Sequence, residues 1–232
     1  MEFHAALIPA TLLRRYKRFL SDHRLTDGRV VMAHCPNPGA MTGLDPPGAE
    51  TWLAPARNPK AKLDYSWELV RVDGGLVGLN TGHPNRIAQE AIAAMRIPEL
   101  AGYESIRREV AYGRNSRVDL LLERAGRPPC YVEVKNVHLK RDDGAEFPDS
   151  VTARGAKHMA ELARMVDGGA RAAVLFIVQR EDCDSFSLAR DIDPGYGEAF
   201  DAARARGVEA LCYCCKLSLA SIRLDRALPI IG

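Results

Sequence analysis

The sequence predicts a two-domain α/β (α+β) protein, in which a small β-barrel precedes a mixed β-sheet flanked by helices. Turn signals interrupt the chain at short intervals up to about residue 82, whereas helical and strand-like patterns alternate after it. The length of 232 residues is also close to the size at which a chain often divides into two domains. We therefore predict one domain over residues 1–82 and a second over residues 83–232.

The first domain is predicted to consist of five short strands, near residues 5–19, 29–34, 49–55, 63–72 and 75–80. Gly, Pro, Asn and Asp cluster between these stretches, which is typical of turns in an all-β region. Five strands favour a small closed barrel such as an OB-fold, although other small barrels have the same number. The turn signals are Asp27-Gly28, Asn37-Pro38-Gly39, Pro46-Pro47-Gly48, Asn58-Pro59 and Asp73-Gly74-Gly75.

The second domain is predicted to fold in the order α-β-β-β-α-β-α-β, which gives a mixed sheet with helices against it. The segment 172–179 is almost continuously apolar, as in a strand buried on both faces. Gly113-Arg114-Asn115 and Gly126-Arg127-Pro128 provide turns between the first three strands. The predicted helices are 86–95, 151–166 and 196–206, and the predicted strands are 105–112, 117–123, 130–137, 172–179 and 208–217.

Composition limits the classes of function that the chain can have. Lys and Arg total 32 and Asp and Glu total 30, so any nucleic-acid binding must come from a local basic patch. The longest apolar run, Ala172–Val178, is far shorter than the roughly 20 residues of a membrane-spanning helix, so we expect no membrane segment. The N-terminus lacks the pattern of an export signal, and we expect a cytoplasmic protein.

The cysteines do not indicate a function. Cys212 and Cys214 are two apart on a predicted strand and share one face, where we expect them in the core. The role of the cluster that they form with Cys215 is left open, as is the oligomeric state. We expect no small-molecule organic cofactor.

The most informative residues lie on two predicted strands that are neighbours in the chain. Asp119 is surrounded by apolar residues, and Glu133 and Lys135 are two apart, so that their side chains point to the same face. Asp119 and Glu133 provide the hard oxygen ligands that Mg²⁺ or Mn²⁺ prefers, and the backbone carbonyl of Val134 is a further candidate ligand. The ion would activate water for attack on a phosphodiester, and Lys135 would orient or deprotonate that water.

An Asp followed fourteen residues later by Glu-x-Lys is the pattern of the PD-(D/E)XK nucleases, and the predicted order of helices and strands is that of their core. We therefore identify Asp119, Glu133 and Lys135 as candidate catalytic residues. The alternative is a structural ion pair of Lys135 with Glu133 or Asp119, because charge clusters also occur in sites without chemistry.

Two predicted helices offer additions to this site. Glu90, on the first helix, is a candidate metal ligand, although exposure to solvent is the simpler expectation. Arg154, Lys157 and His158 share one edge of the second helix with Glu161, where polar side chains can contact a phosphate. A solvated helix face is the alternative.

Two basic clusters in the first domain are candidates for contacts with nucleic acid. Arg14, Arg15, Lys17 and Arg18 surround Tyr16, which combines charge for phosphates with a ring for a base. Alternation along a strand would place Arg14, Tyr16 and Arg18 on one face. A solvated run of charges is the alternative for both clusters. The second cluster consists of Arg57, Lys60 and Lys62.

Several blocks along the whole chain, in order, resemble the sugar fermentation stimulation protein (SfsA) family. This resemblance implies an N-terminal OB-like domain, a PD-(D/E)XK-type second domain, binding of DNA and a regulatory role in sugar utilisation. It also implies a metal triad at Asp119, Glu133 and Lys135. The blocks are Arg15–Leu20, His34–Asn37, Asn58–Lys60, Asn80-Thr81, Gly102-Tyr103, Ile106–Glu109, Tyr131–Val137, Phe147–Asp149, Arg154–His158 and Val178–Arg180.

From these features we expect a protein that binds DNA largely through phosphate contacts and is also a metal-dependent deoxyribonuclease. A second interpretation is a non-catalytic DNA-binding regulator of sugar (maltose-type) metabolism that uses the nuclease fold as a clamp. A third is an interaction protein whose basic patches contact an acidic partner. The intact Asp119, Glu133 and Lys135 favour the enzyme. The choice between DNA and RNA, the strandedness of the substrate and any sequence preference are left open.

Overall fold

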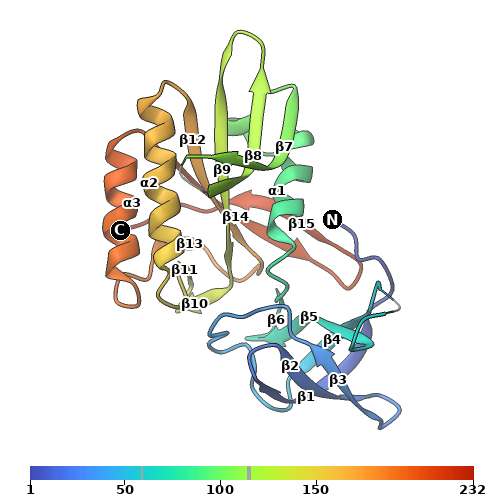
Figure 1. Ribbon diagram of the computed structural model, residues 1–232. Coiled ribbons are helices and arrows are strands. Elements are labelled where there is room, and N and C mark those ends of the chain that lie inside the picture. The colour runs from blue at the N-terminus through green and yellow to red at the C-terminus, as the bar shows by residue number, and fades with distance from the viewer. Residues whose placement is uncertain (59, 114–115) are drawn as a thin grey trace.

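The N-terminal sheet closes into a barrel, as predicted. A computed structural model describes residues 1–58, 60–113 and 116–232 (Figure 1). The strands follow the order β3-β2-β1-β4-β5-β6, and a parallel pairing of β3 with β5 closes the first five of them. The strands are β1 Ile8–Tyr16, β2 Leu20–Leu25, β3 Val30–His34, β4 Glu50–Pro55, β5 Tyr65–Val72 and β6 Gly75–Gly78.

The predicted strand 5–19 is wrong in one respect, because it ends in a turn that leads into β2, a strand that the prediction missed. Lys17 and Arg18 have φ angles of 50° and 64° and form this turn. Strand β2 lacks the usual alternation of apolar and polar residues, because polar residues occupy two of its inward positions. Ser21 and His23 are buried there, and His23 Nε2 forms a hydrogen bond with Ser21 Oγ at 2.8 Å. The predicted fifth strand corresponds to β6, which lies outside the closed ring.

The second domain contains the predicted mixed sheet, in the order β15-β14-β12-β9-β8-β7, with β9, β12 and β14 parallel. Helix α1 covers one face, and α2 and α3 cover the other (Figure 1). The elements are α1 Pro84–Ala93, a 3₁₀ turn Pro98–Leu100, β7 Ser105–Tyr112, β8 Ser116–Arg124, β9 Arg127–Val137, β10 Leu139–Arg141, β11 Gly144–Phe147, α2 Ala153–Asp167, β12 Arg171–Val178, β13 Ser185–Leu188, α3 Pro194–Ala205, β14 Glu209–Leu217 and β15 Ile222–Ala227.

Strand β12 is the continuously apolar segment, and it lies in the centre of the sheet, where both of its faces are covered. Leu175 and Ile177 pack in the core beneath α1, whereas Phe176 and Val178 pack in the core beneath α2 and α3. Both faces are covered, so every side chain of this strand after Arg171 is withdrawn from water. Helices α2 and α3 begin at capping side chains, because Thr152 accepts a hydrogen bond from the Gly155 amide at 3.0 Å and Asp193 accepts one from the Tyr196 amide at 2.9 Å.

The prediction missed β15 and a small sheet of β10, β11 and β13, whose strands have three or four residues each. Residues 1–3, which we predicted to belong to the barrel, pair instead with the start of β15 and the residues just before it: Ile222 N–H donates to the Met1 carbonyl at 2.9 Å. The predicted turns Asn58-Pro59 and Gly113-Arg114-Asn115 include residues 59 and 114–115, which lie outside the described residues.

The six cysteines all lie among the described residues, and none of them forms a disulfide there. Cys212 and Cys215 have Cys-x-x-Cys spacing, but three residues along a strand reverse the face, so Cys212 packs beneath α2 and α3 and Cys215 beneath α1. Both thiols are buried, and burial raises their pKa. Cys212 and Cys214 lie in the core, as predicted.

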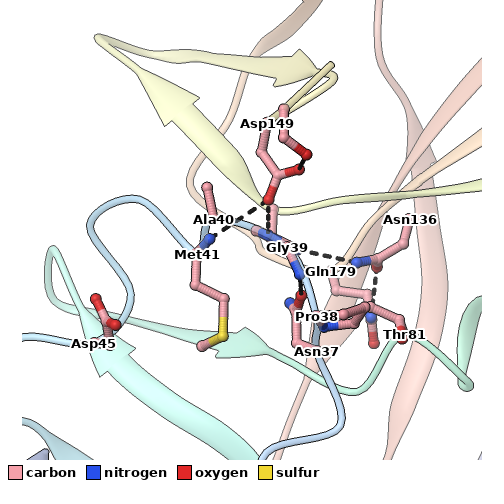
Figure 2. Close-up of polar contacts among 12 residues, drawn as sticks. Asn37, Pro38, Gly39, Ala40, Met41, Asp45, Thr81, Asn136, Asp149 and Gln179 are labelled. Carbon is pink, nitrogen blue, oxygen red and sulfur yellow. Dashed lines mark hydrogen bonds and ion pairs between the residues drawn. The ribbon is translucent and has the colours of Figure 1, made fainter. Parts of the chain in front are cut away.

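The two domains meet in a polar seam. Gly78 N–H donates to the Gln179 carbonyl at 2.8 Å, and Gln179 Nε2 donates to Asn136 Oδ1 at 2.7 Å. Figure 2 shows that the barrel loop of residues 37–41 faces Asp149 of the second domain. A Cβ atom at Gly39 would lie 2.5 Å from Asp149 Oδ2, so the close approach requires glycine. Asn136 follows Lys135 directly, and the seam therefore adjoins the candidate catalytic strand.

None of the helices in the described part of the chain is both long enough and apolar enough to cross a membrane.

Candidate functional site

Asp119 lies where β8 and β9 separate. The pairing of these strands starts at Leu120 and Val132, and beyond this pair the Val134 amide donates to Asp119 Oδ2 at 2.7 Å. From the start of α1, Asn85 Nδ2 donates to Asp119 Oδ1 at 2.8 Å. Two different elements therefore fix the orientation of this carboxylate.

Glu133 is buried on β9 and is the centre of a charged network. Lys135 Nζ donates to Glu133 Oε1 at 2.8 Å, and His158 of α2 contacts the same oxygen. Arg154 Nε donates to His158 Nε2 at 3.4 Å. Because an arginine can only donate, Nε2 of His158 accepts from Arg154, and Nδ1 carries the proton that is donated to Glu133. The structure thus brings together Glu133, Lys135, Arg154 and His158, which the sequence had placed on two separate elements.

The two carboxylates have opposite pKa shifts. Burial, and next the negative charge of Glu133, raise the pKa of Asp119. Burial also opposes ionisation of Glu133, but the hydrogen bond from His158 and the Lys135 ammonium outweigh it and lower the pKa of Glu133. Neighbouring acids with divergent environments are typical of catalytic sites, and they also occur in structural networks.

Three further residues at the site were not predicted. Tyr112 is buried at the end of β7, and its pKa is raised by burial and then by the charges of Glu133, Glu161 and Asp119. Glu161, on α2, is 1% exposed and pairs with Arg164 at 3.0 Å. Its helical spacing from His158 was the signal that could have identified it. Tyr112 and Asn85 carry no comparable signal, because only the fold brings their elements together.

The donor atoms suit a hard divalent cation that keeps part of its water shell. Glu133 Oε2 is buried and has no hydrogen-bond partner among the described residues, and the Asp119 carboxylate belongs to the neighbouring strand. No three His, Cys, Asp or Glu side chains of the described residues are grouped so that they could hold a metal ion by themselves. Two carboxylates supplemented by water are the mode of binding that Mg²⁺ adopts in many enzymes. The Val134 carbonyl stays a predicted ligand.

The structure does not bring Glu90 to this site. Its carboxylate lies 2.8 Å from the Met1 amino group and 2.8 Å from Arg86 Nε, and its side chain is 45% exposed. These two cations lower the pKa of Glu90, against the effect of its partial burial. The residue of α1 that contacts the site is Asn85.

The cluster around Tyr16 is divided by the turn. Arg15 points inward and donates to the carbonyls of Asn37 and Gly39 at 3.1 and 2.9 Å, so it holds the seam loop. Arg14 and Tyr16 share no strand face with Arg18, which the turn carries away, and the predicted common face is therefore wrong. The exposed cations among the predicted nucleic-acid contacts are Arg14, Lys17, Arg18, Arg57, Lys60, Lys62, Arg154 and Lys157, whereas His158 is buried.

Comparison with known proteins agrees with this architecture. Residues 13–79 match the SfsA N-terminal OB domain, and residues 82–221 match the sugar fermentation stimulation protein RE domain. A sugar fermentation stimulation protein homolog from Paramagnetospirillum magneticum is 59% identical over 230 residues, which cover 99% of this chain and 98% of the relative. One from Dinoroseobacter shibae is 58% identical over 233 residues, which cover 99% and 96%.

A solved structure is also similar over the whole chain. The structure of Pyrococcus furiosus SfsA in complex with Ca²⁺ superimposes with a TM-score of 0.89 at 27% sequence identity, and the match covers 100% of this chain and 98% of that one. The chain therefore belongs to the sugar fermentation stimulation protein family.

Proposed function

We propose that this protein binds DNA and hydrolyses phosphodiester bonds with Mg²⁺ or Mn²⁺ held by Asp119 and Glu133. The observation that carries the proposal is the buried, unpartnered Glu133 Oε2, next to a second carboxylate and a lysine. A buried carboxylate oxygen without a hydrogen bond is costly unless a ligand satisfies it. The relative from Pyrococcus furiosus was solved with Ca²⁺, another hard cation that prefers oxygen ligands.

Each residue of the site has a role in this proposal. Asn85 and the Val134 amide orient Asp119, and His158 keeps Glu133 ionised by donating to it. When bound, the ion would polarise the phosphodiester and lower the pKa of a water molecule. Lys135, which lies beside Glu133, orients the attacking water and offsets the charge that grows on the phosphate.

A second candidate function is a non-catalytic, largely sequence-nonspecific DNA-binding regulator of sugar metabolism. One observation favours it: Lys135 and His158 both contact Glu133 Oε1, as in an ion-pair network that needs no metal. Incubation of supercoiled and single-stranded DNA with the protein, with and without Mn²⁺, separates the two functions. Cleavage that requires Mn²⁺ supports the nuclease, whereas binding without cleavage supports the regulator.

Addition of Mn²⁺ should raise the melting temperature, because a ligand that binds only the folded state stabilises it. At about 100 times the dissociation constant the gain is about 2.7 kcal/mol. For a chain of this length that corresponds to roughly 5–10 °C. Asp119→Asn should lose most of the rise in a thermal melt. In the matched variant Glu90→Gln, which alters a carboxylate on α1 away from the site, the rise should remain. If millimolar Mn²⁺ and Mg²⁺ leave the melting temperature of the wild-type protein unchanged, this would contradict the metal site.

DNA affinity should fall linearly with the logarithm of salt concentration, because phosphate contacts release counterions. Lys17→Gln combined with Lys62→Gln should reduce the slope by about 1.8 on duplex DNA, or about 0.9 for each contact. Both lysines are exposed on the barrel, whereas Arg15 is unsuitable for this test because it holds the seam loop. Lys216→Gln, on β14, is the control and should leave the slope unchanged. Anisotropy titrations at several salt concentrations measure the slope, and an unchanged slope in the double variant would exclude these contacts.

A further inference from the structure

An aromatic surface is exposed at the turn between β1 and β2. The Phe19 side chain is 48% exposed, and its ring stacks on His34 with centroids 6.4 Å apart and an angle of 15° between the planes. The backbone fixes this arrangement, because Leu20 pairs with His34 and the Cys35 amide donates to the Phe19 carbonyl at 2.8 Å. An exposed aromatic ring held in this way offers a face on which a nucleic-acid base can stack.

A largely apolar groove of about 490 Å³ lies beside these rings. Its walls come from β2, β3 and β5 and from the loop between β4 and β5, with Leu20, His34, Leu63 and Tyr65 among the lining residues. This is the face, with its flanking loops, on which OB-folds in general hold oligonucleotides. A planar base has two apolar faces, and a groove of this size and lining accommodates one.

The surrounding charge favours a nucleic acid over an apolar peptide or a second copy of this chain. Lys62 lines the groove, and Lys17 and Arg18 are exposed in the same turn as Phe19. Single-stranded nucleic acids are held by this combination of cations for the backbone and aromatic rings for the bases. In a duplex the faces of each base are covered by its neighbours, so only an unpaired base can stack on Phe19.

A second hollow, of about 370 Å³, continues from the groove toward the second domain, and both are lined by Ala56 and Ser66. Arg57 from the barrel, Arg86 from α1 and Arg108 from β7 line this second hollow. Arg57 and Arg108 have no ion-pair or hydrogen-bond partner in the described parts of the chain. Their charges are therefore available to the phosphates of a strand that leaves the groove.

This arginine-lined hollow ends at the start of α1, whose first turn also contacts Asp119. His83 and Arg86 line the hollow, and Asn85, in the same turn, donates to Asp119. Glu68 also lines it, but this carboxylate is buried and accepts two hydrogen bonds from the Asn80 amide, at 3.0 and 3.3 Å. The groove and the arginine-lined hollow therefore adjoin each other, and the first turn of α1 connects the hollow to Asp119 through Asn85.

We infer that the substrate is an unpaired strand of nucleic acid. One base stacks on Phe19 at the edge of the groove, and the backbone crosses the hollow lined by Arg57 and Arg108 toward Asp119. This inference rests on the proposed function, since it names the class of substrate for that same site.

Fluorescence anisotropy in EDTA, which prevents cleavage, tests the base groove. The three labelled probes have equal length: oligothymidylate, the same backbone without bases in its central tract, and a duplex. Phe19→Leu should weaken oligothymidylate binding roughly 5- to 100-fold, because stacking of a base on an aromatic ring is lost. It should change binding of the abasic probe and the duplex less than twofold. Phe19→Trp should restore oligothymidylate binding, and Leu219→Ala, which alters a residue that is 46% exposed on the second domain, is the control.

A second pair of substitutions tests the arginine-lined hollow. Arg57→Gln combined with Arg108→Gln should weaken the oligothymidylate and abasic probes equally and reduce the salt slope by about 0.7 for each arginine, as phosphate contacts on single strands do. Lys216→Gln, which the salt experiment above also uses, is the control.

The possible failures are distinguishable. If Phe19→Leu loses the same affinity for all three probes, or loses no affinity for oligothymidylate, then no base stacks on Phe19. Nucleic-acid binding itself would still stand. A wild-type dimer in sedimentation that Phe19→Leu dissociates would also overturn the base groove, because a second copy would then cover this face. If the wild-type protein binds none of the probes, the proposed function fails as well.

Discussion

Lys135→Met should lower the rate of metal-dependent cleavage about 10²–10³-fold, which is the usual effect of removing one preorganised electrostatic group. The Lys135 ammonium lies 2.8 Å from Glu133 Oε1, so it is close to any ion that Glu133 holds. Methionine keeps most of the length of the side chain and removes the charge. DNA affinity should change by no more than a few-fold, because one phosphate contact among many is a small share. The measurements are a cleavage assay and a binding titration on the same variant.

A melting curve of Lys135→Met distinguishes catalysis from a purely structural ion pair. If Lys135 only neutralises Glu133, the variant should be destabilised by about 3–5 kcal/mol, because a buried carboxylate loses its partner. In a catalytic site that faces a solvated cleft, the loss should be smaller, because water can reach the carboxylate that Lys135 leaves. Lys216→Met, at an exposed position of β14, is the matched control for the change of side chain. Such a destabilisation, with no metal-dependent cleavage by the wild-type protein, would contradict the nuclease and leave the DNA-binding regulator.

The central part of the candidate site could be predicted because it depends on local rules. Glu133 and Lys135 share a face through the two-residue period of a strand, and a short connection makes their strand the neighbour of the one with Asp119. Asn85 and Tyr112 could not be predicted, because their contacts depend on how α1 packs on the sheet and on where β7, its edge strand, ends. No local pattern encodes such a contact.

The fold, like the site, could be predicted where local patterns encode it and not where only the tertiary structure does. The elements of the second domain have apolar patterns long enough to identify, whereas β2 was hidden because polar Ser21 and His23 occupy its inward positions and satisfy each other. The inward role of Arg15 was also not predictable. Its partners are backbone carbonyls of a loop that only the closed barrel brings near.

Arg180 is the charged residue that most clearly ties the two domains together. It is 2% exposed, and its guanidinium donates to Asp182 at 2.6 and 2.7 Å and to the His138 carbonyl at 3.0 Å. It also reaches Asp73 of the barrel at 3.1 Å. Lys140 donates to the same Asp182 carboxylate at 3.0 Å, so one acid balances two cations.

Asp182→Ala should therefore destabilise the protein by about 3–5 kcal/mol, because it leaves a buried guanidinium without its main counter-charge. Denaturant unfolding measures the change. Asp184→Ala is the matched control, since this nearby carboxylate is 85% exposed and pairs with Arg226 at 3.0 Å, and it should cost at most about 1 kcal/mol. A loss below that limit in Asp182→Ala would show that Asp73 alone is sufficient for Arg180.

The pH dependence of stability should report the same carboxylate. Burial opposes ionisation of Asp182, but the hydrogen bonds from Arg180 and Lys140 lower its pKa to about 2, below the usual 3.8. A carboxyl group with a lowered pKa binds its proton more readily in the unfolded chain. Its stabilisation is therefore complete above about pH 4 and is lost as the pH falls toward 2. The difference in unfolding free energy between wild type and Asp182→Ala should shrink over this range, and a constant difference would show that the ionised carboxylate is not what holds Arg180 in place.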